Sequence, residues 1–363
     1  MATQHPSNTI TQLPDLVGAL EDADRARFER VYEVSAAEGR LRAPSAMVPW
    51  IESTFGKLAA VEKQRIVRVS NLVTGEGTLF NELRARRPVR AVLQVENESE
   101  LGLGDDPWAR PTEATPEDTF GRLSNDHGVT AANIAKYDAL HSIIVFSEPD
   151  PLAFTRESVV AHLTLAHDWL HAAHEDDAAA KYPYIMWNCL WRAGGSIVHG
   201  HTQVSLTRGR HYAKIERLRT DAIRYQNANG VSYFNDLVRI HASLGLAHDV
   251  GGVSVLASLT PVKEKECILI ADTADEALGA AVFDTLRVYR DSLGVRSFNV
   301  GMLLPPVDET EESWDGFPVV VRIVDRGNLE TRTSDIGGME MFAEAVVAAD
   351  PFAVHQALVA EGA

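Results

Sequence analysis

Two periods of apolar and polar positions run through the middle of the chain. Residues 141–147 form a compact apolar run of the kind found in buried strands, whereas residues 156–175 carry apolar side chains on one face at helical spacing. Residues 184–190 and 198–206 predict two further strands. The pattern therefore predicts a unit in the order strand, helix, strand, strand.

A similar order returns in the second half of the chain. After two helices, the pattern again indicates strands, a long amphipathic helix and strands, at 213–227, 233–244, 253–259, 266–271, 275–293, 297–304 and 319–324. A helical tail is expected at 339–348 and 352–359. We therefore expect an α+β protein of duplicated halves, in which antiparallel sheets are flanked by helices.

The N-terminal part of the chain differs from these two units. A charged, helix-favouring stretch at 13–38 is followed by Pro44 and Pro49, which interrupt regular structure. A peripheral extension is expected here. The expected boundaries are 1–62 for the extension, 63–210 for a first half that carries a histidine motif, and 211–363 for a second half without it.

The first half is expected to open with a hairpin. Strands at 65–73 and 78–83 flank a Thr-Gly-Glu-Gly link with turn chemistry, and a further strand is predicted at 89–95. Residues 97–126 are rich in Glu, Asp, Pro and Gly, so they predict a long surface loop.

Composition and charge narrow the possible partners. The 363 residues include 34 Lys and Arg against 51 Asp and Glu, a net charge of −17. Such an acidic protein repels nucleic acid, although a local arginine cluster can still attract a small anion. No apolar run approaches the roughly 18 residues needed to cross a bilayer, and the N-terminus lacks the basic and apolar regions of a signal peptide. We therefore expect a cytoplasmic protein that binds neither nucleic acid nor membranes.

The most informative segment is His199-Gly200-His201-Thr202-Gln203. Side chains at a spacing of two share one face of a strand, so His199, His201 and Gln203 are expected to project together. Two imidazoles and an amide make a poor core face, because each polar group needs a partner, but they suit a phosphate site. Two other interpretations stay open at this point: surface histidines without a partner, and a pair that serves only as zinc ligands.

The chemistry at such a site requires a neutral imidazole. It can attack phosphorus if its other ring nitrogen is held, so that the correct tautomer points forward. For His201, the backbone carbonyl two residues earlier on the strand is the expected partner. Gly194-Gly195-Ser196, just upstream, allows close backbone approach and offers N–H donors and a hydroxyl to phosphate oxygens.

The segment from Asn188 to Gln203 resembles the galactose-1-phosphate uridylyltransferase branch of the histidine-triad (HIT) superfamily. That branch shows an Asn, a small-residue loop ending in Ser, and then His-Pro-His-x-Gln; here Gly200 replaces the middle Pro. Further similar stretches bring the coverage to roughly residues 65–358, and they lie at 72–76, 83–88, 133–145, 298–306 and 336–343. The resemblance implies two HIT-like halves, the first of which carries the motif.

The resemblance also implies roles for individual residues. His201 corresponds to the nucleophile that takes up the nucleoside monophosphate, with His199 beside it, and Gln203 to the side chain that steadies the phosphoryl group. The implied substrate contacts are Arg84 and Arg87, which neutralise phosphates, and Asn188, Gly195 and Ser196, which meet phosphate and sugar phosphate.

The family's common zinc site is incomplete in this sequence. That site uses a Cys-x-x-Cys pair and two histidines; His141 and His199 match the histidine positions, and the cysteine pair is absent. Zinc is therefore expected only if other residues complete the ligand set. The second-half strand at 321–326 also lacks the further His-x-His of the uridylyltransferases.

The implied activity is that of a nucleotidyltransferase. It would move a nucleoside monophosphate from a nucleotide sugar such as UDP-glucose to a sugar phosphate, as in galactose metabolism, through a covalent nucleotidyl-His201 intermediate. Two alternatives are a nucleotide-sugar or dinucleotide phosphorylase with the same intermediate, and a catalytically inactive nucleotide-binding relative. A homodimer is expected by analogy with the family.

Overall fold

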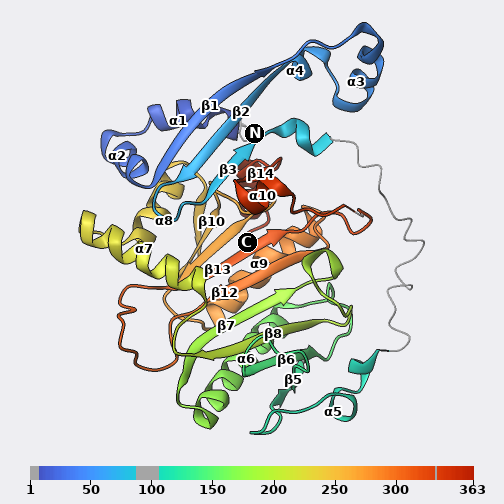
Figure 1. The fold of residues 1–363 in the computed structure, drawn as a ribbon, viewed down its shortest axis with the longest axis vertical. Coiled ribbons are helices and arrows are strands. Elements are labelled where there is room, and N and C mark those ends of the chain that lie inside the picture. Colours follow the sequence, from blue (N-terminus) through green and yellow to red (C-terminus); the bar gives the residue numbers. More distant parts are fainter. Residues whose placement is uncertain (1–7, 87–105, 332) are drawn as a thin grey trace.

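Two sheets organise the structure, a computed structural model that describes residues 8–86, 106–331 and 333–363 (Figure 1). The larger sheet has ten strands, every neighbouring pair antiparallel. In spatial order they are β4 (Ser124–Asn125), β5 (Gly128–Ala132), β6 (Leu140–Phe146), β8 (His201–Arg208), β7 (Ala180–Asn188), β12 (Phe298–Leu303), β13 (Val319–Asp325), β11 (Cys267–Ala271), β10 (Val253–Ala257) and β9 (Ala247–Val250).

The same strand order occurs on both sides of the centre of this sheet. From the outside inward, the first unit runs β5-β6-β8-β7 and the second β10-β11-β13-β12, so the units meet where β7 pairs with β12. One long helix belongs to each unit, α6 (Arg156–Asp176) and α9 (Glu276–Asp291), and the two helices pack against each other. The α+β class with antiparallel sheets flanked by helices is confirmed.

The two long helices begin at side-chain caps and bury one face. Thr155 accepts a hydrogen bond from the backbone of Ser158 at the start of α6, and Asp275 caps α9 in the same way. Trp169 on α6 and Tyr289 on α9 are fully buried. The helical stripes predicted from the sequence therefore form the core against one face of the large sheet.

The smaller sheet joins the two ends of the chain. Its order is β1 (Tyr32–Arg40), β2 (Lys63–Asn71), β3 (Gly77–Phe80) and β14 (Ala345–Val347), and the last pair is parallel. The predicted hairpin is confirmed as β2 and β3. The boundary expected at residue 62 runs through this sheet, because β1 and β2 pair along nine residues.

Two predicted helices are partly wrong. The stretch 13–38 forms α1 (Leu13–Gly18) and α2 (Asp22–Val31), but the chain becomes strand from Tyr32, because pairing with β2 overrides weak helix propensity. The stretch 339–348 forms α10 (Gly338–Phe342) and then β14, which pairs with β3.

Other segments complete the fold. The loop expected at 97–126 contains, within its described part, the short helices η6 (Pro107–Ala109) and α5 (Pro111–Ala114) as well as β4, while the strand predicted at 89–95 lies outside the described residues. No helix in the described part of the chain is long and apolar enough to cross a membrane. The remaining α-helices described are α3 (Val48–Phe55), α4 (Leu58–Glu62), α7 (Ala213–Asn229), α8 (Tyr233–Ser243) and α11 (Pro351–Ala360).

Candidate active site

His201 opens β8, the strand between β6 and β7 in the first unit. Its backbone pairs with Val145 on β6, and continuation of the β7–β8 register places Asn188 level with it on the other side. Thr202 lines a small cavity against α6, so strand alternation turns His201 and Gln203 toward the opposite face of the sheet. These two side chains share a face, as predicted.

The imidazole of His201 is held in one tautomer. Its Nδ1 lies 2.9 Å from the carbonyl oxygen of His199. A carbonyl can only accept, so Nδ1 carries the proton and Nε2 keeps its lone pair. The ring is buried, and burial lowers the pKa of His201 to about 4. The predicted hydrogen bond to the carbonyl two residues earlier is confirmed, and the ring is neutral near pH 7.

His199 precedes β8 and is fixed at both ring nitrogens. Nε2 lies 2.8 Å from the carbonyl oxygen of Phe146, and Nδ1 lies 2.5 Å from Oδ2 of Asp106. The side chains of His199 and Asp106 are 3% and 5% exposed. The ring of Trp108 meets the His201 ring edge-on at 4.6 Å between centroids. Both ring nitrogens of His199 are therefore bound within the protein, so this ring does not face a ligand beside Gln203.

Gln203 is oriented by the histidine that the sequence assigned to a metal. Nε2 of His141 lies 3.0 Å from Oε1 of Gln203, while Nδ1 of His141 accepts a hydrogen bond from the backbone N–H of Tyr137 at 2.9 Å. Nε2 must then be the donor to Gln203. The side-chain oxygen of Gln203 is thereby occupied, which leaves its NH₂ group to donate to a phosphate oxygen.

The expected pair of zinc ligands is not brought together. His141 pairs with Ser205, whereas His199 contacts Phe146, five residues further along β6; at about 3.3 Å per residue the backbones of His141 and Phe146 are about 16 Å apart. In both histidines each ring nitrogen already has a partner. Within 8–86, 106–331 and 333–363, no three His, Cys, Asp or Glu side chains gather as a metal-binding group. The residues that the structure describes do not fit the zinc site of the resemblance.

The glycine-serine loop is built differently from the expectation. The N–H groups of Gly194 and Gly195 donate to the carbonyls of Trp191 and Leu190, so they are not free for a phosphate. A Cβ at Gly195 would lie 2.8 Å from the carbonyl oxygen of Asn188, so this loop needs glycine to fold back on β7. Ser196 is exposed, and its hydroxyl is available to a ligand.

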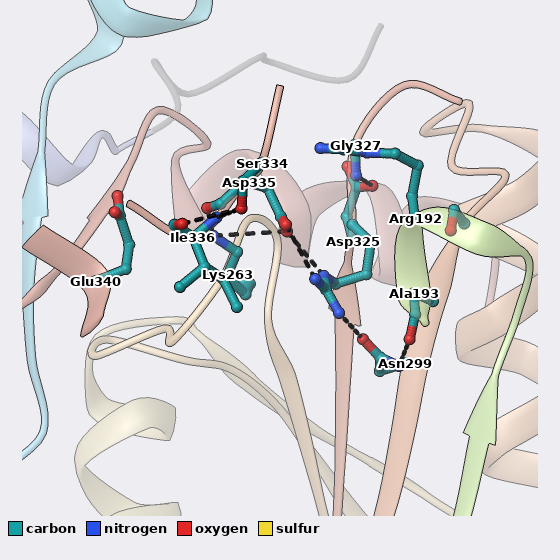
Figure 2. Close-up of polar contacts among 12 residues, drawn as sticks. Arg192, Ala193, Lys263, Asn299, Asp325, Gly327, Ser334, Asp335, Ile336 and Glu340 are labelled. Carbon is teal, nitrogen blue, oxygen red and sulfur yellow. Dashed lines mark hydrogen bonds and ion pairs between the residues drawn. The ribbon is translucent and has the colours of Figure 1, made fainter. Parts of the chain in front are cut away.

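A polar chain leads from the strand beside His201 to a cavity. Asn188 accepts a hydrogen bond from Asn299 at 2.7 Å, and Asn299 accepts one from Arg326. Asn299 also donates to the carbonyl of Ala193 (Figure 2). Arg326 holds Asp335 through two hydrogen bonds of 2.8 and 3.0 Å. This chain spans the ends of three neighbouring strands and ends in the cavity wall.

The cavity has a volume of about 530 Å³. Its lining carries basic and acidic side chains in equal number: Arg84, Arg192, Lys263 and Arg326 against Glu264, Asp325, Asp335 and Glu340. Arg84 lies in the short helix η3 (Glu82–Arg86) and is exposed, while Arg87 lies outside the described residues. Nε of Arg192 is buried and has no partner. Arg84 therefore lines a cavity of mixed charge and is not in contact with His201.

Asp106, Trp108 and Asn299 are the site residues that the sequence reasoning missed. Asp106 and Trp108 lie within the stretch expected to be a surface loop. One signal was present: Trp108 is the sole aromatic residue between positions 97 and 119. A large aromatic residue in an otherwise acidic, Pro-rich stretch indicates that this part of the loop packs against the protein.

Known structures share this architecture, although no protein-family model and no curated protein matches the sequence. An ADP-glucose phosphorylase from Arabidopsis thaliana, with ADP-glucose bound, is 14% identical with a TM-score of 0.59, over 79% of this chain and 95% of that chain. A GalT-like protein from Arabidopsis thaliana is 13% identical with a TM-score of 0.56, over 69% and 90%. A uridylyltransferase is 13% identical with a TM-score of 0.52, over 82% and 98%. The chain has the uridylyltransferase fold.

The uridylyltransferase fold confirms the resemblance in architecture. The sequence motif at 188–203 and the likeness to the known structures indicate the same fold. At 13% to 14% identity the likeness concerns the fold alone, so the chemistry has to be argued from the side chains on that fold.

Proposed function

We propose that the protein is a nucleotidyltransferase in which His201 carries the nucleoside monophosphate. The observation behind this proposal is the hydrogen bond between Nδ1 of His201 and the carbonyl of His199. It leaves the lone pair of Nε2 as the reactive group, and burial keeps the ring neutral. A neutral imidazole of fixed tautomer is what attack on phosphorus requires.

The proposed reaction has two steps. First, Nε2 attacks the α-phosphorus of a nucleotide sugar; an N–P bond forms, the P–O bond to the sugar phosphate breaks, and the sugar phosphate leaves with the electron pair. Second, a phosphate oxygen of an acceptor attacks the same phosphorus, and the N–P bond breaks to return its pair to Nε2. The Nδ1–H bond to the His199 carbonyl persists and stabilises the charge that the ring gains.

The surrounding groups suit an anionic substrate. The NH₂ group of Gln203 and the hydroxyl of Ser196 can donate to phosphate oxygens. Arg84 and Arg192 line a cavity of mixed charge beside the loop that follows β7, and these two arginines can meet the more distant anionic part of the substrate. These contacts position the substrate, which is the main source of catalysis in such transfers.

Two acceptors define two versions of this function. Transfer to a sugar phosphate makes the protein a hexose-1-phosphate uridylyltransferase-like enzyme, with UDP-glucose as the donor and a place in galactose metabolism. Transfer to inorganic phosphate makes it a phosphorylase, the activity of one protein with the same fold, an ADP-glucose phosphorylase. Both versions require the same nucleotidyl-His201.

We also propose that the two units of the large sheet arose by duplication, and that the protein forms a homodimer as uridylyltransferases do. The matching orders β5-β6-β8-β7 and β10-β11-β13-β12 support the duplication. Sedimentation equilibrium tests the homodimer directly.

Intact-mass spectrometry tests the nucleotidyl intermediate. The wild type, His201→Asn and His171→Asn are incubated with UDP-glucose or ADP-glucose; His171 is an exposed histidine on α6 and serves as the matched control. The wild type and the control should gain one nucleoside monophosphate, and His201→Asn should gain none. Adding galactose 1-phosphate or inorganic phosphate should then remove the label and identify the acceptor.

Two results would count against the proposal. Labelling of His201→Asn would move the nucleophile elsewhere. Nucleotide binding without labelling by either donor would favour a catalytically inactive relative of the same fold.

A further inference from the structure

One carboxylate ties the segment after residue 105 to the histidine motif. Oδ1 of Asp106 accepts the backbone N–H of Trp108 at 2.9 Å, and Oδ2 meets Nδ1 of His199 at 2.5 Å. Asp106 thus caps the short helix η6 and holds an imidazole at the same time. Its side chain is only 5% exposed, so both oxygens are used inside the protein.

The His199 ring is clamped at its other end by the backbone of β6. Phe146 accepts from Nε2 of His199 through its carbonyl, and its own N–H donates to the carbonyl of Gly200 at 2.9 Å. The N–H of Gly200 donates in turn to the carbonyl of Pro149 at 2.9 Å. The His199 ring is fixed at both nitrogens, and Gly200 is fixed through both its N–H and its carbonyl. These contacts fix the orientation of the His199 carbonyl, which accepts from Nδ1 of His201.

The side chain of Trp108 contacts both histidine rings. Its ring meets the rings of His201 and His199 edge-on, with centroid distances of 4.6 and 6.2 Å. It packs on the small apolar cluster of Ala131, Ile143 and Val145, on the same face of the sheet. The tryptophan therefore limits rotation of the His201 ring about the hydrogen bond that Nδ1 makes.

The placement of Asp106 distinguishes it from an ordinary loop carboxylate. Burying a carboxylate costs free energy unless it is paired. A carboxylate in an acidic surface loop can instead stay exposed to water, but the side chain of Asp106 is buried. Its two partners are the backbone N–H of Trp108, whose ring packs on His201, and the ring of His199, whose carbonyl accepts from Nδ1 of His201. Both partners contact the imidazole of His201.

We propose that Asp106 is a positioning residue for His201: it fixes His199 and Trp108, which together set the tautomer and the direction of the His201 ring. The proposal rests on the proposed function for its consequence in catalysis. The positioning itself is independent of that function, because it can be read from the state of the His201 ring.

The test compares Asp106→Ala with Asp106→Asn and with Asp350→Ala. Asp350 is the matched control: both of its oxygens also accept hydrogen bonds, from the backbone N–H groups of Ile10 and Phe352, but it lies in another part of the fold. Asp106→Ala should lower the single-turnover labelling rate of His201 by about 10- to 100-fold, with nucleotide affinity close to that of the wild type. Asparagine keeps one oxygen for His199 but turns its NH₂ group toward the backbone N–H of Trp108, so Asp106→Asn should recover only part of the rate.

A spectroscopic readout separates positioning from general stability. In protein labelled with ¹⁵N-histidine, the His201 signals are identified by their loss in His201→Asn. The wild type should show a single Nδ1–H tautomer at neutral pH, whereas Asp106→Ala should show averaging between tautomers and Asp350→Ala should not. This measurement needs no donor, so it gives an answer even if no nucleotide labels the protein.

Two outcomes would overturn the inference. One is a folded Asp106→Ala protein whose His201 signals match those of the wild type. The other is a loss of labelling that is equal in Asp106→Ala and Asp350→Ala and follows their loss of stability.

Discussion

Replacement of Gly200 by alanine tests how closely the histidine motif is packed. A Cβ at this position would lie 2.5 Å from Cδ2 of Phe146 and 3.3 Å from the carbonyl oxygen of Glu148. Phe146 cannot turn aside easily, because its ring stacks on His162 with centroids 3.7 Å apart. The added methyl group should therefore act as overpacking, with a loss of about 1–3 kcal/mol in the free energy of unfolding.

The same substitution should impair chemistry more than binding. Gly200 lies between the carbonyl that holds His201 and the ring of His201 itself, so a shift of the 199–200 peptide weakens the 2.9 Å hydrogen bond at Nδ1. A displacement of about 1 Å can lower a rate by about 100-fold. Gly200→Pro should be worse than Gly200→Ala, because proline also removes the N–H that donates to Pro149.

Urea denaturation and single-turnover labelling measure these two effects. Gly18→Ala is the control: a Cβ there meets nothing within 4 Å, and alanine at this helical position should add up to about 1 kcal/mol of stability. Gly200→Ala combined with Phe146→Leu should recover part of the loss, since the two sites are in contact. A Gly200→Ala protein with wild-type stability and a wild-type labelling rate would refute the packing argument.

Two further predictions concern charge. Burial lowers the pKa of His201 to about 4 from 6.5, so the labelling rate should stay level as the pH falls through 6.5 and decline only near pH 4. Between pH 6.5 and pH 4 the unfolded state binds this proton more readily than the folded state does. His201 therefore lowers the free energy of unfolding as the pH falls through that interval. An acid limb in the rate near pH 6.5 would contradict this. Arg322 pairs with the buried Glu266 and with Glu76 at 2.6 Å each, and Arg322→Ala should cost about 3–5 kcal/mol in urea denaturation by leaving Glu266 unpaired. The exposed control Arg217→Ala should cost less than about 1 kcal/mol, and equal losses in the two variants would exclude this explanation.

Local patterns predicted the fold where a single element determines its own conformation. The stripe on α6 and the apolar run of β6 follow from spacing alone, and the tautomer of His201 follows from the geometry of one strand. The strand β1 and the strand β14 could not be predicted in this way. Each is a strand because of a partner distant in the sequence, and tertiary pairing of this kind overrides local propensity.

The candidate site was predictable to the same extent. His201 and Gln203 lie in one segment, so the spacing of two along a strand was enough to predict that their side chains share a face. The contact of Asp106 with His199 joins residues 93 positions apart, and no periodicity encodes it. For the same reason the resemblance supplied the residue types of the expected zinc pair but not their positions, His141 at one end of β6 and His199 beside Phe146 at the other.

The parallel pairing of β14 with β3 has a consequence for synthesis on the ribosome. Residues 77–80 are made first, and the strand that covers their edge, Ala345–Val347, is made only after residues 81–344 have been added. The Asp350 carboxylate that receives the backbone N–H of Ile10 arrives equally late. Throughout elongation the nascent chain carries an open strand edge, which is a template for wrong pairing between neighbouring polypeptides. We expect a chaperone that shields such edges to raise the yield of protein made at high expression levels.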